Sequence, residues 1–280
     1  MLKYELIIVR LRTIRRTNSI YIMRREVAMD FRKIFDMSVP PKEFDKWRTR
    51  YCDELFADVI ENSRLGINKA ALEIGPGTGQ ATEPILKTGC LYLAIELGEN
   101  FTEDMRNKFG LYDNFQIINA DFETHDFGKN KFDLVYSAAT IQWIPEEIAF
   151  SKIYDLLKSN GILAMFMTHT DYRSSNKALY QKIQSVYDKY FKPETPYTQH
   201  FKYENAMNYG FIDFVCRHYH KVREYNADEF VSWTRIMAGQ LTISEPYKSK
   251  FFEGIRDAIL SFGNKITLLD DITLYLVRKP

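Results

Sequence analysis

The 280-residue sequence has little of what marks several protein classes. Its three cysteines, Cys52, Cys90 and Cys216, lack the spacing of a metal site or a redox motif, so we expect free thiols and no metal. The sequence contains no apolar run long enough to suggest a membrane span. The formal net charge of +1 gives no general attraction to nucleic acid or anionic membranes. These absences favour a cytoplasmic protein without nucleic-acid or membrane partners, acting as a monomer or homodimer.

The positive charge that the chain does have is concentrated at its N-terminus. Residues 1–28 contain seven Lys or Arg and two Glu. The segment has neither the apolar core nor the small-residue cleavage site of a signal peptide, although an Arg-rich transit peptide stays open. A non-native or misassigned extension is favoured, because Met29 would make a plausible natural start. We assign residues 1–40 to a basic extension and leave residues 1–28 out of the fold prediction.

From residue 41 onward, the hydrophobic pattern alternates between helices and strands. Apolar residues at three- and four-residue intervals predict one helix from Pro41 toward Gly66. Strands are then expected at 70–74, 91–95, 115–118, 132–136 and 162–167, with helices near 80–87, 99–109 and 146–158. This order predicts parallel strands joined by helical crossovers.

The pattern changes after Met167. Residues 170–208 look helical and aromatic, 213–225 strand-like, 227–237 and 246–262 helical, and 272–277 form a last strand. The predicted fold is α/β: a Rossmann-like doubly wound sheet, mostly parallel with an antiparallel last strand. Helical lid insertions follow the fifth strand and separate the last two strands. The domains are the extension, a cofactor-binding domain with an N-terminal cap helix at 41–169, and a lid elaboration returning to the sheet at 170–280.

The strongest local signal is Glu73-x-Gly75-x-Gly77-x-Gly79, between a predicted strand and a predicted helix. Glycines let the backbone turn sharply and approach a ligand, although a tight turn without a ligand is the simpler alternative. A dinucleotide fingerprint needs a sixth-position glycine, where this chain has Gln80. A phosphate-binding P-loop needs a lysine, and none follows.

Acidic residues follow the next two predicted strands. Glu96 ends the second strand, where a carboxylate can accept two hydrogen bonds from a ribose diol. Asp121 and Phe122 follow the third strand, where they can accept from an adenine amino group and cover its ring. For Glu96 a solvated strand-end acid is the lesser alternative, whereas Asp121 taken alone is more often a turn residue or helix cap.

Five stretches in this order resemble a class I S-adenosylmethionine-dependent methyltransferase. They are residues 71–79, 94–96, 119–122, 132–139 and 157–163. The resemblance implies S-adenosylmethionine as the cofactor, with its amino-acid part against Gly75, Gly77 and Gly79. It further implies that Glu73 reaches the ammonium group, Glu96 holds the ribose, Asp121 and Phe122 frame the adenine, and Ser137 floors the methionine moiety.

Residues 137–144 further resemble small-molecule methyltransferases of the type 11 and trans-aconitate methyltransferase branch. Members tend to carry an N-terminal motif that Phe44, Arg48 and Tyr51 match here, on a helix that covers the cofactor. We therefore place Arg48 with the cofactor and Tyr51 in the substrate pocket. The Pro-Pro-Tyr or Pro-Pro-Phe of many nucleic-acid and protein methylating enzymes is missing after the fourth strand.

The chemistry that this resemblance implies is an in-line methyl transfer to a small acceptor such as a carboxylate or a phenol. A hydroxyl acceptor would be helped by a general base, for which His169 is the candidate. Trp143 and Arg173 are candidates for the substrate pocket, as a ring wall and a carboxylate partner. A non-catalytic cofactor-binding module and an NAD-dependent oxidoreductase are the alternatives.

Overall fold

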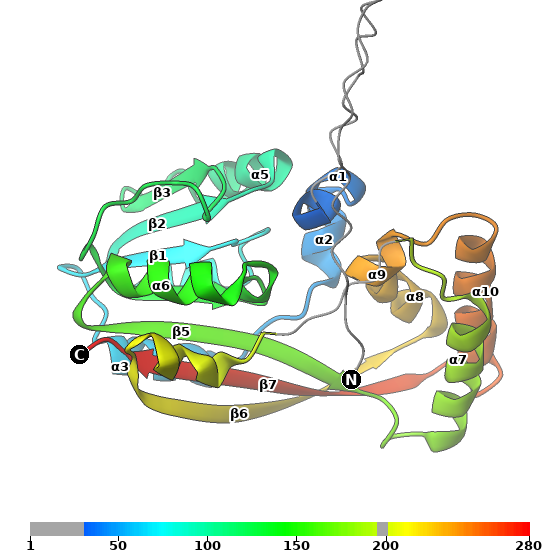
Figure 1. Ribbon diagram of the computed structural model, residues 1–280. Coiled ribbons are helices and arrows are strands. Elements are labelled where there is room, and N and C mark those ends of the chain that lie inside the picture. The colour runs from blue at the N-terminus through cyan, green and yellow to red at the C-terminus, as the bar shows by residue number, and fades with distance from the viewer. Residues whose placement is uncertain (1–30, 195–200) are drawn as a thin grey trace, which may run out of the picture.

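The computed structural model describes residues 31–194 and 201–280 (Figure 1). The expectations for residues 1–28 and for a start at Met29 lie outside this part of the chain. Among the described residues, no helix combines the length and apolar character that crossing a bilayer requires.

A seven-stranded sheet in the order β3-β2-β1-β4-β5-β7-β6 organises the fold. Its strands are β1 (Ala70–Ile74), β2 (Leu91–Glu96), β3 (Phe115–Asn119), β4 (Phe132–Ala138), β5 (Leu157–Asp171), β6 (Ile212–Tyr225) and β7 (Ile266–Arg278). Strands β1 to β5 pair in parallel, whereas β7 is antiparallel to both β5 and β6. The prediction of a mostly parallel Rossmann-like sheet with an antiparallel last strand is confirmed.

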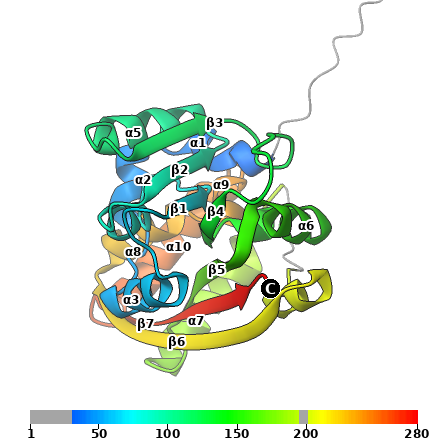
Figure 2. The same cartoon turned by 90° about the vertical axis from the view of Figure 1, so that its left-hand side faces the viewer.

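Helices cover both faces of this sheet, with α3 on one side and α6 on the other (Figure 2). The first part of the chain holds α1 (Ile34–Ser38), α2 (Pro41–Trp47), α3 (Asp53–Ser63), α4 (Thr82–Leu86), α5 (Glu99–Phe109) and α6 (Glu146–Leu156). Short 3-10 helices are η1 (Phe31–Lys33), η2 (Ile141–Trp143) and η3 (Tyr203–Tyr209). Because both faces are covered, β4 is buried along nearly its whole length.

The remaining helices are α7 (Lys177–Tyr190), α8 (Ala227–Arg235), α9 (Ala238–Leu241) and α10 (Tyr247–Leu260). We call these four helices the helical lid. Three of them, α7, α8 and α10, share an apolar core of their own around Ile183, Phe230 and Phe251. They stand at the far ends of the long strands β6 and β7 (Figure 1).

Several predicted elements differ from the structure. The single helix expected from Pro41 toward Gly66 is two helices, because the backbone extends at Arg48 and again at Cys52 before α3 begins. The fifth and last strands are longer than their apolar stretches, since their polar ends pair with each other, as His169 does with Asp271. The predicted helical stretch 170–208 contains α7 and η3, while residues 195–200 lie outside the described chain.

Candidate active site

A cavity of about 310 Å³ opens at the carboxyl ends of the parallel strands. Its floor comes from the residues that follow β1, β2, β3 and β4, where open parallel sheets bind ligands. Its roof comes from α1, α2 and the start of α9, which are distant in sequence. The size and position fit a small-molecule site.

The glycine turn after β1 forms one wall of this cavity. Gly75 and Gly77 line it with φ of 64° and 57°, which is left-handed backbone that glycine adopts without strain. A Cβ on Gly75 would lie 2.2 Å from the Thr140 side chain, so this position also requires glycine for space. Gly79 is not part of the lining: a Cβ there would meet Phe109 at 2.6 Å, so Gly79 serves the packing of the turn against α5.

Glu96 ends β2 with a buried carboxylate at the cavity wall. Its two oxygens accept hydrogen bonds from the backbone N–H groups of Gly77 at 3.0 Å and Gly98 at 2.8 Å. Burial, with a smaller contribution from the nearby carboxylate of Asp36, raises the pKa of Glu96 to about 7. The side chain therefore ties the glycine turn to the end of β2 and keeps lone pairs for a ligand.

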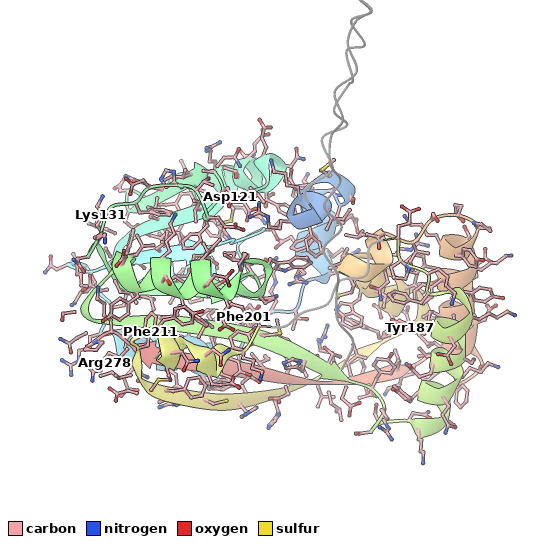
Figure 3. The ribbon with its side chains drawn as sticks, in the orientation of Figure 1. Asp121, Lys131, Tyr187, Phe201, Phe211 and Arg278 are labelled. Carbon is pink, nitrogen blue, oxygen red and sulfur yellow. The ribbon has the colours of Figure 1, made fainter. Side chains whose placement is uncertain are left out.

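Asp121 and Phe122 line the same end of the cavity, as predicted from their place after β3. Asp121 lies on the side of the sheet that faces α1 (Figure 3). Its carboxylate accepts hydrogen bonds from both terminal nitrogens of Arg32, at 2.9 and 3.2 Å, and Arg32 also pairs with Glu123. Phe122 is buried and packs against Phe127.

Glu73 and Ser137 lie beneath the cavity rather than in its lining. Glu73 is fully buried, and one of its oxygens accepts hydrogen bonds from Thr82 at 2.6 Å, Tyr136 at 2.9 Å and the Tyr92 hydroxyl. Its other oxygen, Oε1, has no partner among the described residues. Burial raises the pKa of Glu73. Ser137 donates to the carbonyl of Ile74 at 3.2 Å and so joins β4 to β1.

Arg48 and Tyr51 come from the extended segment between α2 and α3, and both line the cavity. The Arg48 guanidinium lies 5.1 Å from the centre of the Phe44 ring and has no ion pair within the described chain. Burial lowers the pKa of Arg48 and raises that of Tyr51 to about 12, so at neutral pH Tyr51 is a neutral phenol. A buried cation without a counter-charge favours an anionic ligand group.

The opposite end of the cavity is less polar. Trp143 lines it, with its ring edge-on to Phe35 at 5.8 Å, and Met167 and Thr168 of β5 complete the wall. Met237 and Ala238 close it from the helical lid. The lid therefore contributes to the site through the start of α9.

His169 and Arg173 are not in the cavity lining, contrary to the positions expected for them. Strand β5 continues to Asp171, so His169 lies within a three-stranded stretch of sheet, exposed and opposite Asp271. Arg173 follows in a turn, where its guanidinium lies 5.9 Å from the centre of the Tyr180 ring. A strand that ends at Met167 would place both residues beside the pocket, but β5 continues past His169 to Asp171 and carries them away from it.

Sequence reasoning missed the contributions of Arg32, Phe35 and Asp36 to the cavity. They belong to residues 31–40, which the sequence analysis assigns to the extension, although this segment forms η1 and α1. Local sequence gives no signal for Arg32 and Asp36, because their partners Asp121 and Phe101 lie more than 60 residues away. Met237 and Ala238 were also missed, for the same reason.

The parallel sheet, the glycine turn after β1 and the acids after β2 and β3 together define a class I S-adenosylmethionine-dependent methyltransferase domain. Residues 72–165 match the family model described as a methyltransferase domain. This match runs from β1 into β5 and includes the glycine turn, Glu96 and Asp121.

Curated relatives share this same part of the chain. Ribosomal RNA small subunit methyltransferase A of Borrelia garinii subsp. bavariensis is 32% identical over 111 residues, which are 39% of this chain and 38% of the relative. Malonyl-[acyl-carrier protein] O-methyltransferase 1 of Ilyobacter polytropus is 32% identical over 133 residues, 46% of each chain. The chain thus spans less than half the length of these relatives.

Solved structures share the fold over more of the chain. Phosphoethanolamine N-methyltransferase 2 of Haemonchus contortus aligns with a TM-score of 0.54 at 18% identity, covering 90% of this chain and 60% of the other. The YcgJ protein of Bacillus subtilis aligns with a TM-score of 0.55 at 11% identity, covering 81% of this chain and 99% of the other. At these identities the likeness establishes the fold alone.

Proposed function

We propose that this protein binds S-adenosylmethionine in the cavity above β1 to β4 and transfers its methyl group to a small-molecule acceptor. The observation that carries the proposal is that Gly77, Glu96, Asp121 and Phe122 all line the same cavity. They come from three consecutive strand ends and offer a backbone cradle, two carboxylates and a ring.

The residues present suit this cofactor in three respects. The glycine turn carries neither Lys nor Arg, which agrees with a ligand that has no phosphate. Glu96 offers carboxylate oxygens to a ribose diol, and Asp121 with Phe122 offers an acceptor and a ring to the adenine. Arg48, a buried cation within reach of the cavity, suits the carboxylate of the methionine part.

Bound S-adenosylmethionine supplies a methyl group on a positively charged sulfur, open to attack by a nucleophile. The protein's part is to align the acceptor with that methyl group and to exclude water. Phe44 and Met237 in the roof of the cavity, and Trp143 in its wall, are placed to exclude water. A carboxylate acceptor needs no base, and with His169 outside the lining no residue is proposed for that role.

A small acceptor is favoured over RNA by the way the cavity is covered. Segments 31–48 and 237–238 roof it from two sides. After β4 the chain reads Ser137-Ala138-Ala139-Thr140, without the Pro-Pro-Tyr or Pro-Pro-Phe of many nucleic-acid methylating enzymes. The relatives named for ribosomal RNA favour the second candidate, an RNA methyltransferase, through their shared cofactor-binding part.

Within the small-molecule class, we assign the chain to the type 11, trans-aconitate methyltransferase-like branch.

Isothermal titration with S-adenosylhomocysteine tests the cofactor, with NAD as the control ligand. Gly77→Ala should abolish or strongly weaken binding, because the Cβ enters the cradle and left-handed backbone costs alanine about 1–2 kcal/mol. Gly263→Ala is the matched control, because Gly263 has φ of 85°, an added Cβ would meet nothing within 4 Å, and the residue is not part of the cavity lining. Binding of NAD but not of S-adenosylhomocysteine would refute the proposal.

Labelled S-adenosylmethionine then tests the acceptor class. The wild-type protein is incubated with small carboxylic acids, phenols and amines, and separately with ribosomal RNA. Transfer to a small molecule is expected. Label in RNA alone would establish the second candidate, and binding without transfer to any acceptor would favour the non-catalytic module.

A further inference from the structure

The N-terminal strap, which we define as residues 31–48, forms most of the roof of the cavity. Five of its residues, Arg32, Phe35, Asp36, Phe44 and Arg48, line the cavity. Helices α1 and α2 stand between the sheet and the helical lid in Figure 1. A ligand enclosed beneath the strap cannot leave through this side unless the strap moves.

Three polar attachments fasten the strap to the domain below it, and they are made by Arg32, Asp36 and Asp45. Asp45 pairs with Lys108 at 3.3 Å and accepts a hydrogen bond from Gln80 at 3.0 Å. At the first attachment, Arg32 forms a two-pronged ion pair with Asp121 and a further pair with Glu123. These side chains are only about one-quarter exposed, with 26% for Arg32 and 25% for Asp121, so solvent weakens the pair less than at an open surface.

At the second attachment, Asp36 lies on the first turn of α5. Its Oδ1 accepts a hydrogen bond from the backbone N–H of Phe101 at 3.0 Å, and Asn100 donates to its carbonyl at 3.1 Å. A carboxylate at a helix N-terminus is stabilised by the unpaired N–H groups and the helix dipole. Gly98 makes room for it, because a Cβ there would lie 2.5 Å from Asp36 Oδ1 and 2.8 Å from its Cβ.

We propose that the Arg32 ion pair with Asp121 and Glu123 is an electrostatic latch that must open for the cofactor to enter or leave. The proposal rests on the function proposed above, in which Asp121 receives the adenine. The same carboxylate then serves both the ligand and the strap that encloses it. Closure of the strap is thereby coupled to the residue that recognises the adenine, and exchange becomes sensitive to ionic strength.

The latch has a kinetic signature that a direct ligand contact does not share. Weakening the latch opens the strap in both the free and the bound protein, so the rates of association and dissociation should both rise. Removing a ligand contact would raise the dissociation rate alone. For a partly buried pair of this kind, Arg32→Gln should change each rate about fivefold at low ionic strength. The wild-type rates should approach those of the variant as salt increases.

Stopped-flow fluorescence with S-adenosylhomocysteine measures both rates, with Trp143 in the cavity wall as the reporter. Arg256→Gln is the matched control, since it removes an exposed Arg–Asp pair in the helical lid. A rise in both rates for Arg32→Gln alone supports the latch. Unchanged rates, or a rise in the dissociation rate alone, would overturn it.

Amide hydrogen exchange in the ligand-free, full-length protein gives a test that does not depend on the cofactor. Arg32→Gln and Gly98→Ala, which displaces Asp36, should each speed exchange at Val39, Phe44 and Arg48, whose N–H groups bond within the strap. Unchanged protection in both variants would refute the latch. Absence of S-adenosylhomocysteine binding to the wild type would instead refute the proposed function and leave this measurement decisive for the latch.

Discussion

Glu96 links the proposed cofactor site to pH. Its pKa is raised from 4.5 to about 7, first by burial and then by the charge of Asp36. If its carboxylate holds the ribose hydroxyls, the ionised form is the one that binds. Below pH 7 the free protein must then lose a proton to bind, so affinity for S-adenosylhomocysteine should fall about tenfold per pH unit between pH 7 and pH 5.5.

The same shift acts on stability in the opposite sense. The pKa in the folded protein lies above the unfolded value, so the contribution of Glu96 to folding is complete below pH 4.5 and is lost as pH rises through about 7. At pH 8 this loss amounts to about 3 kcal/mol of unfolding free energy. Stability and cofactor affinity should therefore move in opposite directions between pH 5.5 and 8.

The substitution Glu96→Gln separates the charge from the shape of this side chain. The variant should unfold at a temperature less dependent on pH, because the buried charge is gone. At pH 8 it should bind S-adenosylhomocysteine more weakly, since a hydrogen bond to a charged acceptor contributes about 1.5–3 kcal/mol. At pH 5.5 the two proteins should bind with similar affinity, because Glu96 is then mostly protonated in the wild type.

Isothermal titration and thermal unfolding from pH 5.5 to 8.5 measure both effects. Glu224→Gln is the control for loss of a carboxylate, since its ion pair with Lys265 is exposed. Wild-type affinity that stays level across this range, or a Glu96→Gln variant with the wild-type pH slope, would refute the assigned role of Glu96.

Three further predictions concern a buried ion pair of the sheet and two residues beside the site. Arg223→Met should lower the unfolding free energy by about 3–5 kcal/mol, because Asp270 is buried and would lose its ion-pair partner. Denaturant unfolding measures this loss, and the double variant Arg223→Met with Asp270→Leu should restore part of it. Gly79→Ala should lower stability by about 1–3 kcal/mol through its contact with Phe109, while the folded fraction keeps wild-type affinity in titration; a selective loss of affinity would contradict the packing role. Glu73→Gln should change the unfolding free energy by less than about 1.5 kcal/mol. If Glu73 acts on the ammonium group, the variant should also bind S-adenosylhomocysteine more weakly. Equal affinity of the two proteins in titration would assign Glu73 to structure alone.

The parts of the fold that sequence predicted are those in which one short segment determines its own structure. Strand β1 is apolar except for Glu73, and the glycines after it have the positive φ that the turn needs. Helix α5 occupies the predicted residues 99–109 because its apolar positions recur at helical spacing. Glu96, Asp121 and Phe122 follow from the rule that parallel strands present their carboxyl ends at one edge.

The parts that sequence missed depend on partners far along the chain. No residue near Arg48 predicts the break between α2 and α3, since no Gly or Pro occurs from Lys42 to Leu65. The polar end of β5, with His169, is a strand because β7 pairs with it. Arg32 and Asp36 enter the site through contacts with Asp121 and Phe101, which a local pattern does not reveal.

The two halves of the cavity differ in where they come from along the chain, and this difference bears on its specificity. The floor comes from residues 74–144, which lie inside the segment that matches the methyltransferase family model. The roof comes from the N-terminal strap and from Met237 and Ala238, which lie outside it. The floor carries most of the residues proposed for the cofactor, and Arg48 of the strap is a further one. Recognition of the acceptor therefore falls to Met237 and Ala238 in the roof and to Met167 and Thr168 beneath them. Substitutions at Met237 should therefore change which acceptor is methylated, with little effect on S-adenosylhomocysteine affinity, whereas substitutions at Glu96 should change that affinity for every acceptor alike.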